Sequence, residues 1–518
     1  MNPYLKLCIK MFFFTRLFFI SIIIFAFSSN LVSKYDLSSD ILLINNTHNS
    51  NSINIFEKIT LKFLSYFSSY DAIHFILISK HDYFNDSIFA FFPLFPWLIR
   101  GLARVFELIP FKNEYIPFML SGFIISNFIS LCNCLLIFAI IFKLTNSKKK
   151  SKICSFLFLI NPGTIFYISI YSENLYLMLQ LIIINFIIKS GEEKFSELKN
   201  KMLGDITQKK PTYFFQIACL IIGLLMTRSN SVALCTYFII PAMLILFYKE
   251  KYMRSFYFFS FYHNLCQFIK ILHKVFREIG LYIVLCLHAL LCFVYMTKLK
   301  PKFNICSTIR RGINKDTDKF ALFEKWCFHK EIRTGIGSFY SYIQKEYWNV
   351  GFLKQYSFNT LDRILLALPM NILSLYVLYK IYHYFDFGEL YKEFNFGNFF
   401  MKNTLYEDNM IYNHNEHERQ EVVKNSYRNN ITTNAFVIGG GLNYLINFLI
   451  LVFIAHPQIN NRILSGCPIL YLIICDDVLD FMENNKKGNY KKGKAIVLFF
   501  FCYALLGCIM QVGSYGFA

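Results

Sequence analysis

The sequence is poor in charged side chains for its length. Only 17% of its 518 residues are Asp, Glu, Lys or Arg, against about 25% in an ordinary soluble domain. In contrast, 55% of the residues are hydrophobic and 60 are Phe. One soluble core of this length could not bury so much apolar surface. The composition therefore excludes a disordered chain and a fibrous repeat, and it argues against a soluble enzyme.

Metal-binding patterns are also scarce. The 15 Cys stand mostly inside apolar runs, where Cys behaves as a small hydrophobic residue. No CxxC pair or Cys/His spacing points to zinc. Cys306 and Cys327 share one long polar stretch. The sequence is compatible either with a disulfide between them or with two unpaired thiols.

Long uncharged runs are what the sequence does contain, and a bilayer crossing takes about 20 residues. Two of the runs, 174–188 and 463–475, are short and need flanking residues to span. Because a membrane helix satisfies its own backbone, we expect one all-α polytopic membrane domain over 1–518 with about 10 or 11 transmembrane helices. The runs are 17–33, 115–142, 153–172, 174–188, 211–227, 229–248, 279–297, 364–379, 429–461, 463–475 and 495–518.

The net charge of +20 fits a membrane topology. Run 17–33 follows basic residues and predicts an uncleaved signal anchor with a cytosolic N-terminus. The first lumenal loop is then 34–114, and its apolar run 88–99 is too short to span and predicts an interfacial segment. No nucleic-acid-binding module is visible, so we expect no nucleic-acid partner. The other loops are lumenal 298–362, basic cytosolic 143–152, 189–210, 249–278 and 476–494, and variable, partly low-complexity cytosolic 380–433.

Polar residues near membrane depth are the informative ones in such a protein, and this topology places five clusters of them on the lumenal side. Each cluster also has an ordinary structural explanation that involves no function. In chain order these are an exposed loop Asp beside an unrelated His, a Glu at a helix end, an Arg that extends to lipid headgroups, an interfacial aromatic belt and a polar hairpin turn. Together they predict one lumenal site for a membrane-borne substrate. The clusters are 70–75 with Asp82, Tyr83 and Asp86; Asn161-Pro162 with 171–173; 228–230; 326–328 with 341–352; and 456–458 with Asn461-Arg462.

Asp71 and His74 are three residues apart, so on a helix they share one face. A carboxylate beside an imidazole can serve as a general base. Arg228 can bind a lipid phosphate, because a guanidinium fork matches phosphate oxygens.

These clusters resemble the PIG-V type of GPI mannosyltransferase. The chain departs from the family pattern at Tyr70, Asp82, Asp86 and Ser231, where Trp, Gly, Glu and Gly are usual. The matching residues are Asp71-Ala72-x-His74-Phe75, the run 89–96, Asn161-Pro162, Tyr171-Ser172-Glu173, 227–230, Ser341-Tyr342-Ile343-Gln344, 347–353, His456-x-Gln458 and Arg462.

The resemblance implies a GT-C class transferase in the endoplasmic reticulum membrane, with a lumenal active site. It implies transfer of the second mannose, in α-1,6 linkage and with inversion, from dolichyl phosphate mannose to the mannosyl-glucosaminyl-phosphatidylinositol intermediate. No cofactor or metal is expected, and a small accessory membrane subunit is a possible partner. The alternatives are another dolichyl-phosphate-sugar transferase, a polytopic lipid transporter, which usually shows inverted repeats, and a non-catalytic subunit.

The resemblance also assigns roles. Asp71 is the expected general base, Arg228 and Arg462 are expected to hold the leaving phosphate, and His74 is a helper. The remaining expected substrate contacts are Asp86, Glu173, Asn230, Tyr342, Gln344, Tyr347, Trp348, Asn349, His456 and Gln458.

Overall fold

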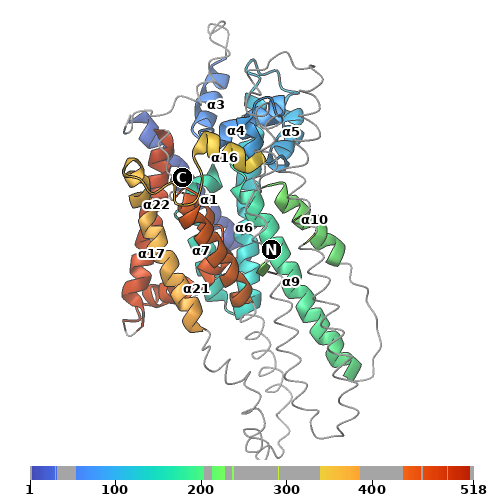
Figure 1. Cartoon of the computed structure of the whole chain (residues 1–518), viewed down its shortest axis with the longest axis vertical. Helices are drawn as coiled ribbons and strands as arrows, with labels where there is room; N and C mark the ends of the chain where they lie inside the picture. The colour runs from blue at the N-terminus through green and yellow to red at the C-terminus, as the bar shows by residue number, and fades with distance from the viewer. Residues whose placement is uncertain are drawn as a thin grey trace, which may run out of the picture.

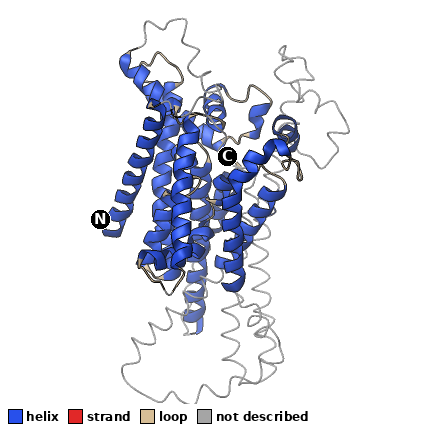
Figure 2. Cartoon of the chain, turned by 90° about the vertical axis from the view of Figure 1, so that its left-hand side faces the viewer, coloured by secondary structure: helices blue, strands red, loops and turns tan. Residues whose placement is uncertain are grey.

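Helices form all the regular structure in the part of the chain that the structure describes (Figures 1 and 2). The computed structural model describes residues 3–29, 31, 54–202, 213–227, 236–237, 287, 290, 339–384, 436–456, 459–486 and 488–513. No strand occurs within these ranges. The predicted all-α class is therefore confirmed for them.

The helix bounds agree with most of the apolar runs. The first half holds α1 (Pro3–Ser28), α3 (Ile55–Ser65), α4 (Asp71–His81), η3 (Ser87–Ala90), α5 (Leu94–Phe106), α6 (Ile116–Thr145), α7 (Lys148–Leu159), α8 (Thr164–Ile168), α9 (Glu173–Met202) and α10 (Tyr213–Leu225). The second half holds α16 (Phe339–Trp348), η8 (Phe358–Thr360), α17 (Leu361–Tyr384), an unlabelled helix Phe436–Phe453, α20 (Asn460–Leu464), α21 (Pro468–Met482) and α22 (Tyr490–Val512).

Five described helices are long and apolar enough to cross a membrane: α1, α6, α17, Phe436–Phe453 and α22. The long helix α6 packs against α5, α7 and α9, while α21 packs against α7 and α22. Short helices α3, α4, α5 and α16 gather at one end of the bundle, at the top of Figure 1. We call this end the α4 end.

Two predicted spans are broken in the structure. Run 153–172 divides into α7 and α8, because Asn161 and Pro162 interrupt the helix; proline lacks the N–H that helix continuation needs. The Asn161 side chain satisfies the freed backbone, since its Oδ1 accepts from the Gly163 N–H at 2.8 Å and its Nδ2 donates to the Phe158 carbonyl at 2.5 Å. Run 463–475 likewise divides into α20 and α21.

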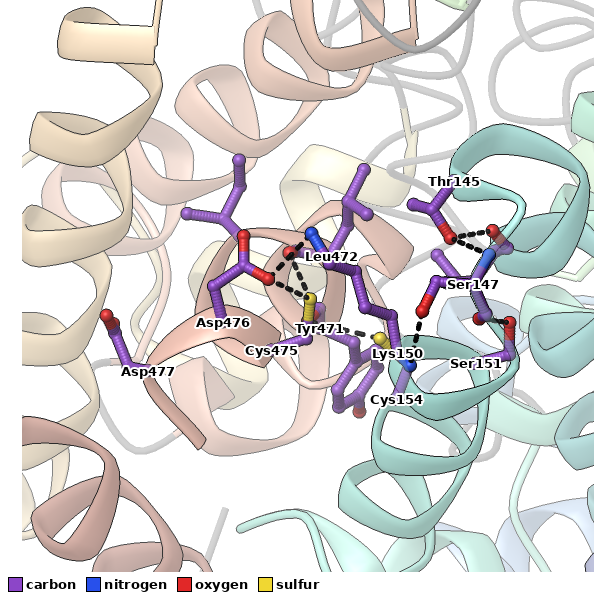
Figure 3. Close-up of polar contacts among 12 residues, drawn as sticks. Thr145, Ser147, Lys150, Ser151, Cys154, Tyr471, Leu472, Cys475, Asp476 and Asp477 are labelled. Atoms are coloured by element: carbon purple, nitrogen blue, oxygen red, sulfur yellow. Dashed lines mark hydrogen bonds and ion pairs between the residues drawn. The ribbon is translucent and has the colours of Figure 1, made fainter. Parts of the chain in front are cut away.

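The opposite end of the bundle is held by ion pairs between distant segments (Figure 3). Lys150 of α7 lies 2.7 Å from the Asp476 carboxylate of α21, and Lys149 lies 2.6 Å from Glu483. The loops around 148 and 483 therefore lie at the same end of the molecule, as the predicted topology requires. On the other side of α21, the fully buried Asp477 carboxylate pairs with Lys380 of α17 at 2.9 Å.

The interfacial segment predicted at 88–99 is a short helix rather than a span. It becomes η3 and the first half of α5, and α5 packs along α4 and α6 at the α4 end. One face of α5 buries Phe95, Ile99 and Ala103, while Trp97 and Leu98 are exposed. This division agrees with an amphipathic helix at a membrane surface.

Candidate active site

Asp71 is the first residue of α4. The position of this helix is fixed by the backbone of the residue before it and by contacts at its far end. Tyr70, the residue before it, has a φ of 57°, a conformation that costs free energy for a non-glycine residue and persists only where the surroundings enforce it. At the far end of α4, Arg100 donates to the Ser79 and Ile78 carbonyls at 2.6 and 2.9 Å. The first bond satisfies a free carbonyl of the last turn, and the second shares the Ile78 carbonyl with the Asp82 N–H. Together they fix α4 on α5.

Arg462 joins two carboxylates that lie far apart in the sequence. Its Nη1 donates to Asp71 Oδ2 at 2.5 Å, and its Nε donates to Glu173 Oε1. Glu173 begins α9 just as Asp71 begins α4, so both carboxylates lie at helix N-termini, where the helix dipole favours negative charge. The side-chain exposure rises from 0% for Glu173 through 11% for Arg462 to 31% for Asp71. Asp71 is thus the accessible member of the group.

Two aromatic rings enclose the Arg462 guanidinium. Its central carbon lies 4.9 Å from the Tyr171 ring centre and 5.4 Å from that of Phe166. The Tyr171 hydroxyl donates to the Ser69 carbonyl at 3.0 Å, which ties this ring to the turn before α4. Burial lowers the pKa of Arg462, but Glu173 and Asp71 raise it by more, so the net pKa lies above the ordinary value. The guanidinium is therefore permanently charged.

The α7–α8 break packs against α20 behind Arg462, at a contact that the sequence did not predict. A Cβ built on Gly163 would lie 2.7 Å from the Asn461 carbonyl oxygen and 3.3 Å from the Arg462 Cα. Only glycine therefore allows the α7–α8 turn to pass this close to the backbone that carries Arg462. The Asn-Pro-Gly sequence is typical of a turn, but run 153–172 was predicted as one continuous span.

His74 lies one turn along α4 from Asp71 and faces an aromatic group. Its ring stacks on Phe91 at 4.6 Å between centres, and Phe91 meets Trp348 edge-on at 6.2 Å. Burial lowers the pKa of His74, although the Asp71 charge acts in the opposite direction. Its Nδ1 is buried without a hydrogen-bond partner among the described residues. A neutral, stacked imidazole is better suited to fixing the shape of the site than to supplying positive charge.

Helix α16 covers η3 with part of the predicted aromatic stretch. The His456 Nε2 lies 2.9 Å from the Trp348 carbonyl oxygen, so His456 holds the end of this helix. Asp86 is buried beside η3. Burial raises the pKa values of Tyr342 and Tyr347, and the Asp86 charge raises them further. Tyr342 and Tyr347 therefore lie within electrostatic reach of Asp86.

The structure brings some of the predicted residues into contact and leaves others apart. Asp71, Glu173 and Arg462 meet directly, and a second group forms around Phe91 and Trp348. Gln344 and Asn349 contribute backbone carbonyls to the end of α16, which accept from the Val350 N–H and the Gln355 amide at 3.1 and 2.8 Å. Arg228, Asn230 and Gln458 lie outside the described residues, as do Cys306 and Cys327.

The residues that sequence reasoning missed lie around Arg462. Gly163 and Phe166 were not among the predicted site residues, and Tyr171 was noted only as part of a motif. In the sequence they appear only as a short turn and aromatic residues inside an apolar run, which is also typical of an ordinary membrane helix.

Comparison with known proteins identifies the family. A family model described as mannosyltransferase (PIG-V) matches residues 6–517. A Drosophila pseudoobscura protein named GPI mannosyltransferase 2 is 22% identical over 471 residues, which cover 89% of this chain and 88% of that protein. A Candida albicans protein of the same name is 26% identical over 351 residues, covering 67% and 73%.

Solved structures give a weaker comparison. The archaeal oligosaccharyltransferase AglB from Archaeoglobus fulgidus, in complex with an inhibitory peptide and a dolichol-phosphate, aligns with a TM-score of 0.39 and 11% identity. The alignment covers 96% of this chain, which spans only 56% of that protein. A TM-score this low does not establish a shared fold, so the family assignment depends on the sequence matches. Because the family model spans nearly the whole chain, this protein belongs to the mannosyltransferase (PIG-V) family and is a glycosyltransferase.

Proposed function

We propose that this enzyme transfers the second mannose of the GPI-anchor precursor. The donor is dolichyl phosphate mannose, and the acceptor is the mannosyl-glucosaminyl-phosphatidylinositol intermediate. The names of the relatives, GPI mannosyltransferase 2, support this reaction. The enzyme is a multi-pass protein of the endoplasmic reticulum membrane, and the α4 end faces the lumen. A small accessory membrane subunit is a further proposed partner.

The observation that carries the proposal is the position of Asp71. Its carboxylate is the exposed end of a charged group whose other members are buried. An inverting transfer needs one base for the attacking hydroxyl and no second carboxylate nucleophile. The β-linked donor and the α-1,6-linked product require such an inversion.

In the proposed reaction, the acceptor 6-hydroxyl attacks the anomeric carbon while Asp71 takes its proton. The new bond joins the acceptor oxygen to that carbon, and the bond from the carbon to the phosphate oxygen breaks. The electron pair leaves with dolichyl phosphate, whose growing negative charge needs fixed cations. Arg228 supplies one of them. Arg462 can supply a second, because neither of its carboxylate contacts uses Nη2.

No metal is needed in this scheme, because guanidinium groups can hold a single phosphate. Gln458, Asn230, Tyr342 and Tyr347 are among the proposed substrate contacts. His74 and His456 shape the walls of the site.

The test is complementation of cells that lack the second GPI mannosyltransferase, with identification of the glycolipid that accumulates. We expect the chain to restore surface GPI-anchored proteins and to consume a one-mannose intermediate. Asp71→Asn should abolish rescue at normal protein level. Asp82→Asn is a matched control: it lies at the other end of α4 in an exposed ion pair with Arg100, and such pairs contribute little. Accumulation of a different glycolipid, or full rescue by Asp71→Asn, would contradict the proposal.

A further inference from the structure

Glu173 was expected to bind a sugar hydroxyl, but its carboxylate is paired with the Arg462 guanidinium. Its side chain is fully buried and one of its oxygens accepts from the Arg462 Nε. A residue that hydrogen-bonds a substrate hydroxyl must be reachable by the substrate, and this one is covered by the protein. Its contact is with Arg462, which in turn holds Asp71. Glu173 therefore acts on Asp71 through the guanidinium.

The surroundings hold Arg462 between the two carboxylates. Phe166 and Tyr171 flank its guanidinium, and the Gly163 turn packs against its backbone. The Nε and Nη1 groups of this guanidinium each donate to a different carboxylate. One positive charge is thus shared between two negative charges.

Sharing a cation changes how basic each carboxylate is. A carboxylate that has a guanidinium to itself is a weak base, because the opposite charge favours its ionised form. A second carboxylate on the same guanidinium weakens that effect, and it also repels the first carboxylate directly. A third anion near the guanidinium would likewise make each carboxylate more basic.

We propose that Glu173 is a positioning residue that, through Arg462, sets the basicity of Asp71 and couples it to the arrival of the donor phosphate. This inference rests on the proposed function, since it requires a phosphate-linked donor and Asp71 as the base. When the phosphodiester of the donor approaches Arg462, the guanidinium divides its charge among three anions. Asp71 is then released to accept the proton of the acceptor hydroxyl. Without the donor, the same carboxylate stays paired.

The first test is the pH dependence of transfer by the full-length protein in detergent, with dolichyl phosphate mannose and the one-mannose acceptor. We expect activity to fall at acid pH as Asp71 becomes protonated. His74 and Tyr171 also interact electrostatically with Asp71, and the Glu173 variants leave both of them in place. Glu173→Gln removes one negative charge, so Asp71 should bind Arg462 more strongly and its acid limb should move to lower pH by about one unit or more. The plateau kcat should fall roughly three- to tenfold, because a less basic carboxylate takes a proton less readily.

Two variants separate this role from a purely structural one. Glu173→Asp keeps the charge, so its acid limb should stay at the wild-type pH even if the rate falls. Glu57→Gln is the matched control, because Glu57 is also buried and accepts from the Lys112 backbone N–H at 2.7 Å, but on α3. Its acid limb should not move. An unmoved limb in Glu173→Gln, with a loss that follows protein level, would overturn the proposal.

A second measurement needs only the wild-type protein and one variant. If donor binding releases Asp71, protonation of Asp71 must in turn favour donor binding, because linkage is reciprocal. The Kd of dolichyl phosphate mannose, measured without acceptor, should therefore fall as pH decreases through the acid limb. Asp71→Asn should remove this pH dependence. A flat Kd in the wild type would refute the coupling. Absence of any transfer or donor binding by the wild type would instead refute the proposed function.

Discussion

The contact between the α7–α8 break and α20 gives a sharp prediction about Gly163. Replacing Gly163 with alanine should reduce transfer without unfolding the protein. The backbone at this residue, with φ −92° and ψ 14°, is open to alanine, so the substitution tests the contact and not the conformation. The new Cβ would lie 2.7 Å from the Asn461 carbonyl oxygen, whereas ordinary contact begins at 3.4 Å. The backbone before Arg462 must therefore move by about 0.7 Å.

That displacement has a predictable cost. A misplacement of about 1 Å in a catalytic group can cost about 100-fold in rate, so we expect kcat to fall roughly 10- to 100-fold. Overpacking of this kind costs about 1–3 kcal/mol of stability, which should leave most of the protein folded. Nothing lies within 4 Å of a Cβ built on Gly101 of α5, so Gly101→Ala is the matched control. The assay is transfer by detergent-solubilised protein, normalised to the amount of folded enzyme.

Wild-type kcat for Gly163→Ala at normal protein level would show that the position of Arg462 does not depend on this contact. A reduced rate in Gly101→Ala of the same size would show that the effect is not specific to the turn.

Three further predictions concern charge. Arg228→Lys should weaken donor use, seen as a higher KM for dolichyl phosphate mannose at unchanged expression, because lysine loses the two-pronged phosphate contact; unchanged donor kinetics would remove Arg228 from the phosphate site. Burial lowers the pKa values of His74 and His456 in the folded protein, so the unfolded chain binds protons more readily at these residues. The Tm in detergent should therefore fall as pH drops below about 6.5, and a constant Tm would contradict this. Lys380→Met should lower the free energy of unfolding by about 3–5 kcal/mol, because the buried Asp477 carboxylate loses its cation and keeps only the Tyr376 hydroxyl as a partner among the contacts described. Adding Asp477→Asn should restore much of the loss, and equal losses in the single and double variants would argue against the ion pair.

Much of the architecture could be predicted because it depends on local chemistry. Uncharged runs located α1, α6, α17 and α22, since lipid demands long apolar helices. Lysine clusters placed the loops at 148 and 483 at one end, and the ion pair between Lys149 and Glu483 agrees with this. The breaks at Asn161-Pro162 and before α21 were missed, because the runs around them remain apolar and hydropathy does not register a short turn.

The sequence by itself determined that this is an all-α membrane protein, and it predicted a functional site among its few polar residues. It also supplied Asp71, Glu173 and Arg462 as separate candidates. Only the tertiary structure decided that Arg462 holds both carboxylates, across separations of 391 and 289 residues, and that His74 stacks on Phe91 instead of facing a charge. The physical reason is that a side chain's role depends on its partner. Hydropathy and spacing specify which end of the bundle a residue reaches, but only the packing of helices far apart in sequence specifies which side chains meet there.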